Sequence, residues 1–191
     1  MSTPPLLLVT APLPSLQESE LISTCRKLIL NDGDWVFMTS DTEFLALQLN
    51  NHAQPLSATQ SLVTETLDSI SAKTLTLLEP GLGFVQRSGQ AIPITAQTTV
   101  VRYKTSPGDR GAVLDACVNL FAYAEKNEMD VYSLAIMNLV ESEDEFIIFE
   151  RYADKEAEQR HLASPRCVDC LTVIKGMIIG HDSRSYKVLD I

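Results

Sequence analysis

His161 is the side chain of this sequence best suited to acid–base chemistry. It stands four residues after Ala157 in a predicted helix, on the face that should pack toward a sheet, while Glu156, Gln159 and Arg160 lie on the opposite face. An imidazole that titrates near neutral pH could remove a proton from a phenol or from a 1,3-dicarbonyl carbon. The alternative is a structural histidine bonded to a neighbouring carbonyl or carboxylate. Both interpretations stay open at this stage.

Two predicted strands carry polar side chains among apolar ones. Alternation places Glu150 and Tyr152 on one face of their strand, and Tyr132 and Asn138 on one face of the neighbouring strand, whereas Arg151 points the other way. A few polar groups in an apolar lining are typical of a ligand pocket. We therefore predict substrate-binding roles for Tyr132, Asn138, Glu150 and Tyr152, with packing or solvation at the rim as the alternative for each.

The cysteines favour neither a metal site nor a disulfide framework. Cys167 and Cys170 form a CxxC pair, but His161 and His181, the nearest histidines, are separated from it by helix breaks, and structural zinc usually takes four closely spaced ligands. The chain has no export features, so free thiols are expected. We predict no metal site, and four unpaired cysteines: Cys25, Cys117, Cys167 and Cys170.

The elements that must position these residues occur twice in the order βαββαβ. In the first half, strands are predicted at 6–11, 35–39, 44–49 and 74–78, with helices within 15–29 and 57–70. In the second half, strands are predicted at 98–104, 131–140, 146–152 and 186–191. The first helix of that half should begin at Ser106-Pro107. A second helical region should run from 154 to 175, with a break at Ser164-Pro165.

This repetition predicts an α+β fold of two ferredoxin-like units, at 1–79 and 97–191, joined by a connector at 80–96 that is rich in glycine and proline. Each unit has helices on one face of its sheet and a bare apolar second face. Packing of the two bare faces would give an intramolecular, pseudo-dimeric α/β barrel. A barrel of about eight strands can hold one small ligand.

Composition narrows the class of partner. Hydrophobic residues make up 45% of the chain, and the net charge is −10 because the chain has 25 acidic and 15 basic residues. Proteins that bind nucleic acids or anionic membranes usually have clustered lysine and arginine residues. This acidic chain is therefore not expected to bind either partner. The sequence shows no secretory signal and no run of about 18 apolar residues, so we expect a cytoplasmic location.

The second unit resembles the antibiotic biosynthesis monooxygenase (ABM) family of dimeric α/β barrels. Residues 145–154 (EFIIFERYAD) and 156–165 (EAEQRHLASP) keep the family pattern of an apolar strand ending in an acidic, basic and aromatic run, followed by a helix with His-Leu before Ser-Pro. The resemblance covers about residues 97 to 175, whereas the first unit matches only in element order. It implies a tandem in which the two halves of one chain replace the usual homodimer, and pairing with a second copy stays open.

The resemblance implies a cofactor-independent monooxygenase that oxidises a phenolic or anthrone-like polyketide to a quinone in secondary metabolism. His161 would be the base, with Tyr132, Asn138 and Tyr152 as hydrogen-bond donors to the substrate oxyanion. Two alternatives remain: a polyketide cyclase or isomerase that uses the same pocket without oxygen, and a non-catalytic ligand-binding or interaction protein. Haem degradation is not expected, because His161 stands where the haem-degrading subgroup has its tryptophan.

Overall fold

A computed structural model of the chain describes residues 6–12, 25, 34–50, 74–84, 92–93 and 95–189. These residues belong to two compact units. The first comprises residues 1–79 together with 188–191, and the second comprises residues 80–187. Within the described residues, no helix is long and apolar enough to cross a membrane.

Unit 1 contains four antiparallel strands in the order β2-β3-β1-β4, the order of a ferredoxin-like sheet. Each predicted strand of this unit is confirmed: β1 is Leu6–Pro12, β2 is Asp34–Thr39, β3 is Glu43–Asn50 and β4 is Thr74–Phe84. Phe37 and Phe44 stack in its core with ring centroids 6.3 Å apart. The helices predicted within 15–29 and 57–70 lie outside the described residues, except for Cys25, which is helical and buried.

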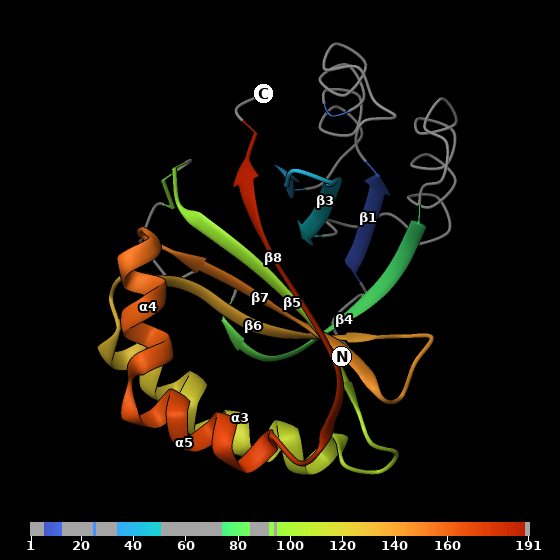
Figure 1. Ribbon diagram of the computed structural model, residues 1–191. Coiled ribbons are helices and arrows are strands. Elements are labelled where there is room, and N and C mark those ends of the chain that lie inside the picture. The colour runs from blue at the N-terminus through green and yellow to red at the C-terminus, as the bar shows by residue number, and fades with distance from the viewer. Residues whose placement is uncertain are drawn as a thin grey trace. The chain divides into compact units, whose positions relative to one another are not determined.

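Unit 2 repeats this arrangement, with strands in the order β8-β5-β7-β6. Three helices cover one face of the sheet (Figure 1). The strands are β5 (Gln97–Thr105), β6 (Val131–Leu139), β7 (Glu145–Tyr152) and β8 (Ile178–Val188), and the helices are α3 (Arg110–Asn127), α4 (Lys155–Ala163) and α5 (Pro165–Ile174). The order of elements confirms the predicted α+β class and the ferredoxin-like unit.

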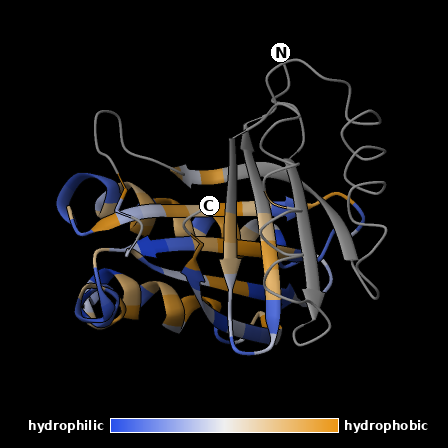
Figure 2. Cartoon of the chain, turned by 90° about the horizontal axis from the view of Figure 1, so that it is seen from above, coloured by the Kyte–Doolittle hydropathy of each residue, from blue (hydrophilic) through white to orange (hydrophobic). Residues whose placement is uncertain are grey.

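The core of unit 2 lies between the helices and the sheet. Helix α3 buries one stripe against β6 and α5, and the strands of the unit carry long hydrophobic stretches (Figure 2). Burial of apolar area at roughly 25 cal/mol per Å² holds the helices on the sheet. The buried residues of α3 recur at helical spacing, as predicted: Val113, Cys117, Leu120, Phe121 and Ala124.

The predicted break at Ser164-Pro165 is confirmed. Helix α4 ends at Ala163, and Ser164 caps α5 by accepting a hydrogen bond from the Cys167 N–H (3.3 Å). Pro165 takes the first helical position, where its missing N–H costs nothing. At the other end of α4, the Asp154 carboxylate accepts from the Ala157 N–H (2.7 Å). The two caps fix the start of each helix, and α4 carries the histidine and the glutamate described below.

Three element boundaries differ from the sequence prediction. Helix α3 begins at Arg110 rather than at Ser106, because the preceding residues form a turn in which Gly108 has a φ of +86°. Strand β8 begins eight residues before Tyr186; its polar stretch does not alternate, and backbone pairing with β5 extends the strand. Strand β4 continues to Phe84, into the expected connector, and lies there beside β6.

Candidate active site

A cavity of about 340 Å³ lies between the sheet and the three helices of unit 2. Apolar side chains from α3, α5 and the strands form most of its wall. Seven polar residues from β5, β7, β8 and α4 also line it: Thr99, Tyr103, Glu150, Glu158, His161, His181 and Ser183. Ligand pockets in proteins are typically about 300–1,000 Å³ and combine an apolar lining with a few polar groups. The cavity therefore has the size and lining for one small ligand.

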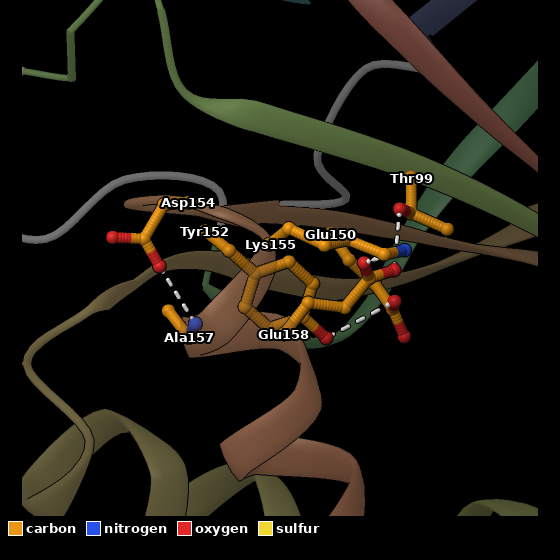
Figure 3. Close-up of polar contacts among 7 residues, drawn as sticks. All are labelled: Thr99, Glu150, Tyr152, Asp154, Lys155, Ala157 and Glu158. Atoms are coloured by element: carbon orange, nitrogen blue, oxygen red, sulfur yellow. Dashed lines mark hydrogen bonds and ion pairs between the residues drawn. The ribbon is translucent and has the colours of Figure 1, made fainter.

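Glu150 and Tyr152 form a buried polar pair on β7. They are two residues apart, so strand alternation places both on the helix-facing side of the sheet. The Tyr152 hydroxyl donates to Glu150 Oε2 over 3.1 Å (Figure 3). No described residue hydrogen-bonds to the other carboxyl oxygen, Oε1. The pair therefore leaves one acceptor or donor position of Glu150 available to a ligand.

Burial changes the acid–base properties of this pair. The pKa of Glu150 is raised to about 7, chiefly because burial removes water from the carboxyl group. The hydrogen bond from Tyr152 opposes this rise, and the nearby Glu158 carboxylate contributes to it. Burial, followed by the charge of Glu150, raises the pKa of Tyr152 well above its ordinary value. Near neutral pH, Glu150 can thus hold or release a proton, whereas Tyr152 remains a hydroxyl donor.

Glu158 is a second buried carboxylate, placed on α4 beside Glu150. Thr99 on β5 donates to Glu158 Oε1 over 2.9 Å, and Lys155 forms an ion pair with Oε2 (Figure 3). Only 6% of the Glu158 side chain is exposed, compared with 57% for Lys155. A buried charge needs such partners to offset its loss of hydration. Glu158 is therefore satisfied within the protein, unlike Glu150.

His161 is buried on α4 and faces the cavity, as its spacing from Ala157 predicted. Its Nδ1 lies 2.5 Å from Glu128 Oε2, and its ring is 5.7 Å from the Tyr152 ring. No described residue hydrogen-bonds to Nε2. A carboxylate on Nδ1 favours the tautomer with the proton on that nitrogen, which leaves Nε2 as a proton acceptor. The arrangement is that of an oriented general base.

The structure does not bring Tyr132 and Asn138 to this cavity. A β-bulge in β6 pairs Val131 with Tyr152 and Ser133 with Arg151, so that Tyr132 is the extra residue. Strict alternation, on which its predicted orientation depended, therefore does not hold at Tyr132. Asn138 lies opposite Phe146, four residues from Leu134, which is about 13 Å along the strand. Of the predicted site residues, His161, Glu150 and Tyr152 come together.

Four further polar residues complete the site, and sequence reasoning did not assign them. Thr99 and Tyr103 alternate along β5 with their side chains toward the helices, and Glu158 precedes His161 by three residues on the same helix face. The spacing of these three residues along β5 and α4 could have assigned them to the site from sequence alone. No spacing could have assigned Glu128, because it follows α3 and reaches His161 across 33 residues of sequence.

The cysteines of unit 2 belong to the wall of the cavity. Cys117 and Cys170 Sγ atoms lie 3.9 Å apart, all four cysteines are free, and burial raises the pKa of Cys167 to about 12. A thiol with a raised pKa is a poor nucleophile near neutral pH. Among the described residues, no three histidine, cysteine or acidic side chains form a group that could hold a metal ion.

No protein-family model matches the sequence, and no curated protein is significantly similar to it. Solved structures match along the whole chain. A candidate monooxygenase from Fusobacterium nucleatum has a TM-score of 0.79 at 14% identity and covers 100% of this chain and 94% of its own. An anthrone oxidase-like protein has a TM-score of 0.68 at 12% identity, with coverage of 100% and 94%.

A third solved structure, from Listeria monocytogenes, is a ferredoxin-fold protein related to antibiotic biosynthesis monooxygenases. Its TM-score is 0.65 at 9% identity, and it covers 100% of this chain and 97% of its own. Identities this low establish the fold and leave the chemistry to the residues of the site. The chain has the fold of the ABM-related ferredoxin-like proteins, with two such units in tandem.

Proposed function

We propose that unit 2 is a cofactor-independent monooxygenase that oxidises a phenolic or anthrone-like substrate to a quinone. The observation that carries the proposal is the pair of buried His161 and half-buried Glu128, whose histidine lines a largely apolar cavity. The names of two structures with the same fold, a candidate monooxygenase and an anthrone oxidase-like protein, support the same class of reaction.

His161 is the base of the proposed reaction. Glu128 accepts a hydrogen bond from Nδ1–H and stabilises the imidazolium that forms when Nε2 takes a proton from the substrate. The resulting carbanion or phenolate is electron-rich and reduces O₂ itself, so the protein need only bind, orient and deprotonate the substrate. One methylene and one O₂ then give one carbonyl and one water. Tyr152, whose hydroxyl donates to Glu150, holds that carboxyl in place at the edge of the cavity.

The cavity lining agrees with a neutral aromatic substrate. Glu150 and Glu158 face the cavity, and the one lysine bonded to them, Lys155, is already paired with Glu158. An anionic substrate would meet two carboxyl groups, and no lysine or arginine is among the described residues that line the cavity. A phenol or anthrone enters uncharged and becomes an anion only beside His161, where the transferred proton leaves a compensating positive charge.

Oxygen consumption with a hydroxyanthrone tests the proposal. The wild-type protein should consume one O₂ for each quinone formed, and His161→Ala should lower the rate by about a hundredfold while circular dichroism shows a folded chain. Gln159→Ala is the matched control, because this exposed residue lies on the same helix and does not line the cavity. Turnover that continues without oxygen would instead identify a cyclase or isomerase.

Glu128→Gln should lower kcat by ten- to a hundredfold and leave KM nearly unchanged. The glutamine amide can donate to Nδ1, which favours the tautomer with the proton on Nε2 and removes the base. Steady-state kinetics over a range of pH measure the effect. Glu125→Gln, at an exposed position of the same chain segment, is the control. Equal rates for the two variants would show that Glu128 does not position His161.

A further inference from the structure

Glu150 Oε1 is a carboxyl oxygen beside the cavity that no described residue binds. Glu150 is 9% exposed and its Oε2 already accepts from Tyr152, whereas Oε1 has no hydrogen-bond partner among the described residues. An unbonded carboxyl oxygen on a residue that lines a cavity is available to a group on a ligand. Glu150 faces the same cavity as His161.

The groups around Glu150 favour its neutral, protonated form. Besides Tyr152 on its own strand, the titratable groups that share its cavity are Tyr103 on β5, Cys117 on α3, Glu158 and His161 on α4, Cys167 and Cys170 on α5, and His181 on β8. Lys155 is paired with Glu158, and His161 is paired with Glu128. No described cation is bonded to Glu150, so a proton is the simplest way for the buried carboxyl to avoid an uncompensated charge.

We propose that Glu150 is the general acid that protonates the departing hydroxide when a hydroperoxide intermediate collapses to the quinone. The inference rests on the proposed monooxygenase function and adds a second catalytic residue to it. The first half of that reaction adds O₂ to the deprotonated carbon, and the His161 imidazolium returns its proton to the peroxide to give R₂CH–O–OH and a neutral His161. The second half must break the O–O bond, which requires a proton for the leaving oxygen.

The step balances with the groups present. His161 removes the remaining C–H proton, the C–H electron pair forms the C=O bond, the O–O bond breaks, and the leaving oxygen takes the proton of Glu150 as water. The substrate carbon is oxidised and the peroxide oxygen is reduced. His161 then holds one proton more and Glu150 one fewer, and transfer of that proton through the Tyr152 hydroxyl or water restores both groups.

The test is the yield of quinone per O₂ consumed, with a hydroxyanthrone as the substrate. Glu150→Gln keeps the size of the side chain and an oxygen for Tyr152 but has no acidic proton. We expect O₂ uptake within about threefold of wild type, and a quinone yield per O₂ at least tenfold lower, with peroxide detected by a coupled peroxidase assay. Glu150→Asp should restore part of the yield. Glu145→Gln, at the start of the same strand, is the control.

The outcomes separate the inference from the function on which it rests. A wild-type protein that consumes no O₂ overturns the proposed monooxygenase and the acid role with it. Normal O₂ uptake with an unchanged quinone yield in Glu150→Gln overturns the acid role alone. Loss of O₂ uptake in a folded Glu150→Gln protein also overturns it, because Glu150 would then act before the peroxide forms.

Discussion

Gly83→Ala is expected to lower the free energy of unfolding by at least about 3 kcal/mol. Gly83 lies in the second half of β4 with a φ of +97°, a conformation that side chains rarely adopt. A Cβ added there would lie 2.0 Å from the Leu134 carbonyl oxygen and 2.7 Å from the Phe121 ring. A backbone atom of a hydrogen-bonded strand cannot move aside as a flexible side chain can, so strain and overpacking add together.

Two other glycines of unit 2 are controls for this prediction. A methyl group added at Gly111, in the first turn of α3, would meet no heavy atom within 4 Å, so Gly111→Ala should be neutral or stabilise the helix slightly. Gly108 is also free of neighbours but has a φ of +86°, so Gly108→Ala measures the backbone strain without the clash. Urea unfolding of the three variants gives the comparison. An equal loss for Gly83→Ala and Gly108→Ala would contradict the close approach to Leu134.

The described strands and helices followed from local patterns. Alternation located β5, β6 and β7, and the apolar stripe that includes Cys117 located α3. The patterns failed where backbone geometry outweighed side-chain type. The stretch with Pro80 and Gly83 was expected to be a connector, yet it forms a strand because glycine allows close contact with β6. A bulge in β6, which no side-chain pattern predicts, removes Tyr132 from the pairing register with β7.

The candidate site divides in the same way. His161, Glu150 and Tyr152 were predicted because each lies on one face of a single element, and periodicity is a local property. The partners that set their chemistry come from other elements. Glu128 reaches His161 across 33 residues and Thr99 reaches Glu158 across 59, and only the three-dimensional fold brings them together. The raised pKa of Glu150 likewise follows from burial, which the sequence alone does not specify.

Glu150→Gln is expected to stabilise the protein at pH 8 by about 3 kcal/mol. Burial raises the pKa of Glu150 from 4.5 to about 7. Below pH 4.5 the carboxyl is protonated in the folded and the unfolded chain alike, so it contributes no penalty. Between pH 4.5 and 7 the unfolded chain releases this proton while the folded chain retains it, and stability falls as the pH rises. Above pH 7 the folded protein carries a buried charge at full cost.

The glutamine variant carries no such charge, so its advantage over wild type should grow from near zero at pH 4 to its full value at pH 8. Chemical unfolding at a series of pH values measures this difference. Glu158→Gln is the matched comparison and should be destabilising at pH 8, because it removes the ion pair with Lys155 from a carboxylate that is already satisfied. A difference between Glu150→Gln and wild type that does not change with pH would show that Glu150 is ionised alike in both states. It would also remove the proton that the proposed acid must supply.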